Sequence, residues 1–156
     1  MKNKITLAIT LALAAILVVV GVTVWAGPSR QGTVPTPEDE VDLVPGAPVS
    51  LGTVEVTCGC AGRALRVEDP EEDFGPAPDG LNFLADGVTV LTDDGCRVEV
   101  CYPYPTEVEE KDGNIYKWDE ENEEWDITLS EVSGDPARIC VVDDDVTEDT
   151  FVLIGK

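Results

Sequence analysis

The 156-residue sequence contains no histidine, and this absence excludes several catalytic mechanisms. Without an imidazole the chain has neither a Ser–His nor a Cys–His nucleophile pair. It has only four serines, none of them in a G-x-S-x-G elbow, and it lacks a glycine-rich phosphate loop. Composition alone still permits acid–base catalysis by two carboxylates. Because the acids cluster in segments that we expect to be solvated loops, we predict that the protein is not an enzyme.

Basic residues are scarce, since 10 lysines and arginines stand against 32 acids, for a formal net charge of −22. The first 26 residues contain two bases, Lys2 and Lys4, and no acid. Residues 27–156 therefore hold eight bases and all 32 acids, a net charge of −24. This charge repels nucleic acid and anionic lipid headgroups, so no nucleic-acid partner is expected.

A long apolar run without a charge is ITLAITLALAAILVVVGVTVWA, residues 5–26. As a helix it would be about 33 Å long, which is enough to cross the hydrocarbon core of a membrane. We predict an uncleaved transmembrane signal anchor with residues 1–4 as a cytoplasmic tip, because Lys2 and Lys4 flank its inner end. A cleaved secretory signal that ends at VWA is the alternative. In both cases the rest of the chain would lie outside the cytoplasm, on a single-pass membrane protein or secreted.

Residues 27–50 hold five of the 11 prolines and predict an extended, acidic spacer. From position 51 onward the apolar residues recur with a period of two. In TVEVTCGC, for example, the apolar residues and cysteines at 54, 56, 58 and 60 share one face. About eight short strands follow, at the spacing typical of a β-sandwich. They include VTVLT and CRVEVCY as two separate strands, and ARICVV and TFVLIG as two more. The predicted fold is therefore all-β, with a single antiparallel β-sandwich domain in residues 51–156 behind the N-terminal helix.

Two of the three tryptophans lie in NIYKWDEENEEWDIT, residues 114–128. NIYKW and EWDIT both read as strands, joined by an acidic loop. If Trp118 faces Trp125, then Tyr116 faces Ile127, and Ile115 points to the other side. We predict a hairpin whose aromatic face covers the core. The alternative is that Tyr116, Trp118 and Trp125 form an exposed stacking surface for sugars.

The five cysteines are Cys58, Cys60, Cys96, Cys101 and Cys140. Outside the cytoplasm they would tend to form disulfides. Cys58 or Cys60 lies on the apolar face of its strand, and Cys96 lies on the apolar face of another, which favours a bridge between these two strands. Cys101 and Cys140 are the second candidate pair. One cysteine remains unpaired. Zinc binding at C-G-C is disfavoured, because the chain has no histidine and the spacing is not the common two-residue one. The alternative is reduced cysteines that pack as small hydrophobic residues.

Acidic runs such as DDDVTED offer the oxygen ligands that calcium prefers. None matches the twelve-residue loop with its fixed glycine and terminal glutamate. We therefore predict no cofactor, with calcium as the alternative and Asp143, Asp144 and Asp145 as its candidate ligands.

Three segments resemble the ZU5-type β-sandwich modules and similar Ig-like modules of bacterial and archaeal surface proteins. They are GLNFLADGVTVLTDDGCRVEVCYPYP, IYKWDEENEEW and RICVVDDDVTEDTFVLIGK. The positions that carry the resemblance are Gly80, Phe83, Val88, Val90, Tyr116, Trp118, Trp125, Phe151 and Leu153. Some ZU5-type relatives cleave themselves at a His-Phe-Ser step. This chain has DTFVL at that place, so self-cleavage is not carried over. The chain also has Gly87 where the family has proline. The resemblance implies a β-sandwich used for structure or protein interaction.

The sequence thus predicts a membrane-anchored extracellular β-sandwich protein with a structural or protein-interaction role at the cell envelope. Its expected partners are the membrane, through residues 5–26, and an envelope protein or polysaccharide. The alternative is a secreted carbohydrate- or calcium-binding module. Buried indole rings would favour the first hypothesis, and an exposed aromatic patch would favour the second.

Overall fold

The computed structural model describes residues 39–104, 112–134 and 136–156. The predicted membrane segment 5–26 and the first part of the predicted spacer lie outside these ranges. Within them, no helix is both long enough and apolar enough to span a membrane.

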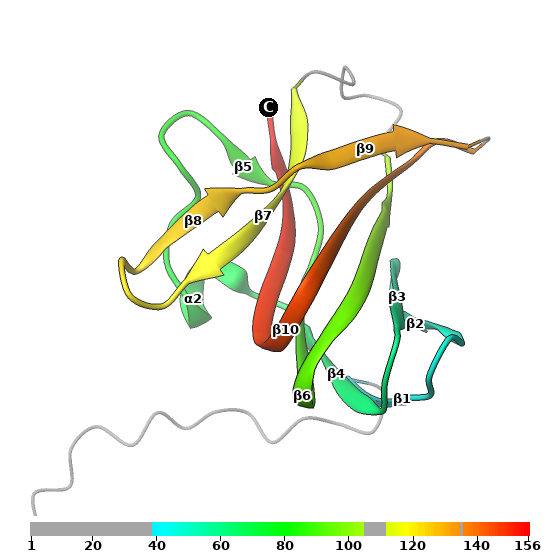
Figure 1. The fold of residues 1–156 in the computed structure, drawn as a ribbon. Helices are drawn as coiled ribbons and strands as arrows, with labels where there is room; N and C mark the ends of the chain where they lie inside the picture. Colours follow the sequence, from blue (N-terminus) through cyan, green and yellow to red (C-terminus); the bar gives the residue numbers. More distant parts are fainter. Residues whose placement is uncertain (1–38, 105–111, 135) are drawn as a thin grey trace, which may run out of the picture. The chain divides into compact units, whose positions relative to one another are not determined.

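The described chain is an all-β domain in which every strand pairing is antiparallel (Figure 1). Its elements are β1 (Glu40–Leu43), β2 (Pro48–Leu51), β3 (Val54–Cys58), β4 (Gly62–Val67), α2 (Pro70–Asp73), β5 (Asn82–Phe83), β6 (Gly87–Pro103), β7 (Gly113–Asp119), β8 (Glu124–Ile127), β9 (Ser130–Ser133) and β10 (Arg138–Gly155). The prediction of an antiparallel all-β fold is confirmed.

Two long strands, β6 and β10, organise the sheet and pair with each other along most of their lengths. Their register shifts between Asp143 and Val146 and again between Val146 and Glu148. Such bulges bend a strand, and the bend of β10 is plain in Figure 1. On one side of the bends the strand order is β1-β4-β6-β10-β7-β8; on the other side β2, β3 and β9 extend the same two strands. The result is a β-sandwich-like pair of layers that share β6 and β10.

The main core lies between the inward faces of these two layers. The period-two pattern of the sequence is preserved there: Val54, Val56 and Cys58 of β3 are buried, as are Val98 and Val100 of β6. They belong to one cluster with buried residues of the other layer, among them Ala64, Val88, Val90, Ile115, Phe151 and Leu153. The hydroxyl of the fully buried Tyr102 donates a 2.8 Å hydrogen bond to the carbonyl oxygen of Phe151.

A second, smaller apolar cluster lies on the outer face of the β7–β8–β10 layer. Its buried members are Trp125, Val152 and Ile154. The segment that carries α2 and β5 packs against this face and adds Phe74, Ala77, Leu81 and Phe83. The short helix is capped by the carboxylate of Asp69, which accepts a 3.1 Å hydrogen bond from the amide of Glu72. This layer is therefore covered on both faces.

Two sequence predictions need correction. The folded region begins before residue 51, because β1 and β2 occupy part of the predicted spacer 27–50 and bury Leu43 and Leu51. The prolines there suit a short edge strand and a turn, so they do not prevent pairing. The expected short strands at VTVLT and CRVEVCY are also one continuous strand, as are those at ARICVV and TFVLIG. Turn-like residues within each strand form bulges and do not end it.

Candidate functional site

The β7–β8 hairpin has the register that the sequence predicts: Trp118 faces Trp125, and Tyr116 faces Ile127. The carboxylate of Asp119 closes the connecting loop by accepting hydrogen bonds from the amides of Glu121 and Asn122, at 2.8 and 3.2 Å. The side chain of Asn122 donates a further bond, and together these bonds lower the pKa of Asp119. The predicted hairpin and its loop are confirmed.

The aromatic face of the hairpin packs into the outer cluster, not the main core. Trp125 is only 6% exposed, and its indole N–H donates to the carbonyl oxygen of Gly75 at 3.2 Å. Its ring makes T-shaped contacts with the rings of Phe74 and Phe83, at centroid distances of 5.7 and 5.8 Å. The hairpin residue that enters the main core is Ile115, which lies on the opposite face. The prediction that the aromatic face covers the main core is therefore wrong, because the docked α2 segment provides a separate apolar surface.

A shallow pocket of about 370 Å³ opens beside the tip of this hairpin. Trp118, which is partly exposed, forms part of its wall. The other lining residues are Lys117, Asp119, Glu120, Glu121, Asp126, Glu148 and Asp149. Six carboxylates and one ammonium group therefore surround the opening, which gives the pocket a strongly negative potential.

Lys117 connects this pocket to the predicted calcium ligands. Its ammonium nitrogen lies 2.8 Å from a carboxylate oxygen of Asp143 and 3.0 Å from one of Asp149. Partial burial acts to lower the pKa of Lys117, but the hydrogen bonds to both aspartates raise it overall. Partial burial likewise acts to raise the pKa of Asp143, but the hydrogen bonds from Lys117 and from backbone amides outweigh it, so the pKa is lowered.

The three aspartates do not converge on one point. Asp143 is held by Lys117, while Asp144 pairs with Arg97 at 3.0 Å. Among the residues that the structure describes, the groups of three or more metal-ligating side chains include none of the three. Asp143 and Asp144 therefore act here as partners of bases on neighbouring strands.

Four of the five cysteines form two disulfides, Cys60–Cys96 and Cys101–Cys140. Both agree with the pairs that the sequence favours, and of the two candidates in C-G-C the structure selects Cys60. The second bridge joins residues that are direct partners in the β6–β10 register. The first is positioned by the β3–β6 ladder, which the amide of Gly59 extends by donating to the carbonyl oxygen of Arg97 at 2.8 Å.

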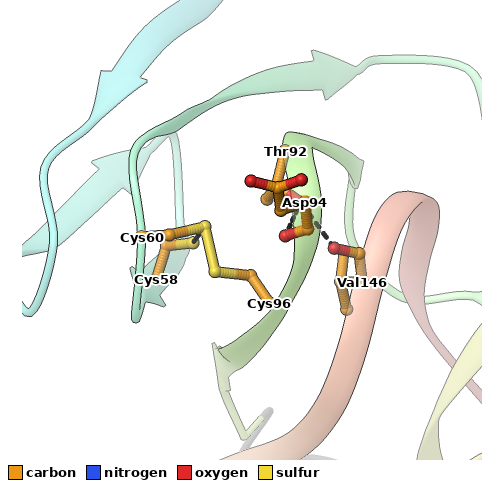
Figure 2. The surroundings of a disulfide bond; sticks show 6 residues. All are labelled: Cys58, Cys60, Thr92, Asp94, Cys96 and Val146. Carbon is orange, nitrogen blue, oxygen red and sulfur yellow. Dashed lines mark hydrogen bonds between the residues drawn. A yellow bond between two sulfur atoms is a disulfide. The ribbon is translucent and has the colours of Figure 1, made fainter.

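Cys58 is the free cysteine of the described chain, and it is buried. Its sulfur lies 3.7 Å from that of Cys60, so three sulfur atoms gather at one place (Figure 2). The sulfurs of Cys58, Cys60 and Cys96 lie within 4.8 Å of one another, as do the ligand atoms of a second group, Glu99, Cys101 and Cys140. Thiolates in such groups are ligands that soft metal ions prefer, but each group contains a disulfide here.

Sequence reasoning did not identify Lys117, Glu148 and Asp149 as neighbours at the hairpin pocket. Lys117 offered one signal, because it is the single base between Lys111 and Arg138 in an acidic segment. The two ion-pair partners of Lys117, Asp143 and Asp149, lie on β10, far away in the sequence. The pairing of β7 with β10 brings this strand beside Lys117.

The fold and the cysteine pairs define a disulfide-containing, antiparallel all-β domain with an acidic surface. Comparisons with protein-family models, with curated proteins and with solved structures return no match. The function is therefore argued from the chain's own residues.

Proposed function

We propose that this protein is a membrane-anchored, extracytoplasmic β-sandwich module of the ZU5-like kind, with a structural or protein-interaction role at the cell envelope. Residues 5–26 would anchor it, and the acidic domain would face outward. We propose no catalytic activity, because the chain has no histidine and the carboxylates gathered beside the hairpin line a shallow, open pocket.

The observation that carries this proposal is the pair of disulfides. Disulfides form and persist in oxidising compartments and are rare in the cytosol. Both bridges start on β6: Cys60–Cys96 joins it to the segment just after β3, and Cys101–Cys140 joins it to β10. They support an extracytoplasmic position, and the charge-free run at 5–26 supplies a physical means of export.

The edge of the β7–β8 hairpin supports a role in protein interaction. β8 is the last strand in the order of its layer. Ile127 on this strand is 63% exposed, and Leu129 just beyond it is 98% exposed. An open strand edge beside exposed apolar side chains is a surface that another protein can cover by adding a strand.

The topology is tested in cells that express the full chain with an epitope tag after Lys156. We expect the protein in the membrane fraction, with its tag removed by protease added to intact spheroplasts. A full-length protein in the cytosolic fraction, or a tag that becomes accessible only after lysis, would contradict the proposal. A soluble product that begins near Gly27 would instead identify a cleaved signal.

The second candidate function is binding of a carbohydrate or of calcium, and the pocket beside Trp118 favours it. Iodide quenching of a Trp25→Phe variant reports on Trp118 and Trp125 alone. Emission that is shielded from iodide, and unchanged by added polysaccharide, would eliminate the stacking surface. For calcium, an unfolding midpoint that is the same with calcium and with chelator would eliminate a specific site, because a ligand that binds the folded state raises the midpoint.

A further inference from the structure

The three-sulfur cluster of Cys58, Cys60 and Cys96 has a property that neither disulfide has alone. A free sulfur lies at contact distance from a sulfur of an existing bridge, with 3.7 Å between Sγ of Cys58 and Sγ of Cys60. A disulfide is exchanged when a thiolate attacks one of its two sulfurs and displaces the other. The attacking atom and the atom attacked are therefore already adjacent in the folded protein (Figure 2).

We propose that this cluster is an intramolecular thiol–disulfide exchange site. The thiolate of Cys58 attacks Sγ of Cys60, a Cys58–Cys60 bond forms, and the Cys60–Cys96 bond breaks. Cys96 leaves as a thiolate and takes up the proton that Cys58 released to solvent. One disulfide and one thiol are present before and after the step, so no external oxidant or reductant is needed.

The exchange changes which cysteine is accessible. Cys58 is fully buried on the core face of β3, whereas Cys96 is partly exposed. Cys96 is also flanked along β6 by the exposed residues Gly95 and Arg97, beside the irregular part of the β6–β10 pairing. The step would thus transfer the free thiol from the core to the surface, where a disulfide of another molecule could react with it.

The local backbone can hold the Cys58–Cys60 disulfide that the exchange forms as well as the Cys60–Cys96 disulfide that it breaks. Gly59 separates the two cysteines that would join, and it lacks the side chain that would hinder closure of the short Cys-Gly-Cys ring. A Cβ at this position would lie 3.3 Å from the carbonyl oxygen of Arg97. Loss of the Cys60–Cys96 bridge leaves β3 held by its ladder with β6 and by Val54 and Val56 in the core.

Trypsin distinguishes the two states of the full-length protein. Cleavage after lysine and arginine places Cys58 and Cys60 in peptide 31–63 and Cys96 in peptide 67–97. Before exchange these peptides are linked. After exchange, 31–63 carries an internal disulfide and 67–97 carries a free thiol that iodoacetamide traps. The protein is incubated with iodoacetamide at neutral and at mildly alkaline pH, denatured in acid, digested and analysed by mass spectrometry.

We expect alkylated peptide 67–97 to accumulate as the linked pair disappears, faster at the higher pH because the attacking species is the thiolate. Cys58→Ser removes the attacking sulfur, so the linked pair should persist and Cys96 should stay unmodified; Cys58→Ala serves if the serine variant does not fold. The linked peptides 98–111 and 139–156, which hold Cys101 and Cys140, report that the domain is intact.

Three outcomes would overturn the proposal. The first is that peptides 31–63 and 67–97 stay linked in the wild-type protein, with either Cys58 alone alkylated or no cysteine alkylated. The second is equal alkylation of Cys96 in the wild type and in the Cys58 variants. The third is a rate that rises in proportion to protein concentration, because exchange within one molecule is independent of concentration.

Discussion

Trp118 and Trp125 lie directly opposite each other across the β7–β8 hairpin, with ring centroids 5.1 Å apart and planes inclined by 64°. This edge-to-face geometry is one of the two arrangements that aromatic pairs prefer. Phe74 meets both indoles, at 5.6 and 5.7 Å, so the pair also fastens the α2 segment to the sheet. The two tryptophans thus hold two parts of the domain together.

Replacing Trp125 should destabilise the domain strongly. Truncation of a buried tryptophan to alanine costs about 3–5 kcal/mol, because the side chain leaves a cavity and its contacts are lost. The control is Ile127→Ala, two residues along the same strand and 63% exposed, for which we expect a change within about 0.5 kcal/mol. Chemical denaturation measures both. Equal small losses in the two variants would show that the indole is not buried in solution.

The Lys117–Asp143 pair should contribute to stability in a pH-dependent manner. The folded pKa of Asp143 is lowered, so its contribution is complete above the unfolded value of about 3.9 and is lost as the pH falls through the folded pKa. We expect Asp143→Asn to cost about 0.2–1 kcal/mol at pH 7, the range for exposed and half-exposed pairs. The gap between the melting temperatures of variant and wild type should narrow as the pH drops below about 4. Asp144→Asn, which removes a carboxylate from a more exposed ion pair, is the matched control. A difference in melting temperature between Asp143→Asn and the wild type that widens in acid would contradict the prediction.

Removal of the Cys101–Cys140 bridge should lower stability without changing the fold. The bridge closes a loop with a sequence separation of 39, and loss of a disulfide of this kind costs about 2–4 kcal/mol. The double variant Cys101→Ser, Cys140→Ser should keep its β-type circular dichroism spectrum and unfold at lower denaturant concentration. A midpoint equal to that of the wild type, with both free of reductant, would show that the bridge does not form.

Gly155 should not tolerate a side chain. A Cβ at this position would lie 2.8 Å from Cδ1 of Leu84 and 2.9 Å from Cα of Gly113, closer than real Cβ contacts. Gly155→Ala should therefore push β10 away from β7 and cost about 1–3 kcal/mol, as overpacking does. The neighbouring change Lys156→Ala, at an exposed position, should be nearly neutral. Thermal unfolding compares the two variants. A Gly155→Ala variant as stable as the wild type would contradict the close packing.

Local patterns predicted well those features that depend on neighbours in the chain. The alternation at Val54, Val56 and Cys58 identified the core face of β3, and the spacing of Trp118 and Trp125 gave the hairpin register. Both follow from the period of two along a strand, which any pairing of that strand must respect.

Features that depend on distant segments could not be predicted in the same way. Turn-like residues such as Asp93, Asp94 and Gly95 indicated the end of a strand, whereas pairing with β10 carries β6 through them as a bulge. Phe74 and Phe83 are irregularly spaced in an acidic segment, and their burial depends on docking onto a layer built from other parts of the chain. The position of Cys58 beside a completed bridge likewise depends on the β3–β6 register.

The passage of β6 and β10 through both layers has a consequence for any attempt to shorten the protein. A cut that separates the layers severs two strands in mid-length and leaves each fragment with an open apolar face. Neither half is therefore a candidate for independent expression, and a transplant into another protein must keep the two layers together on uncut β6 and β10.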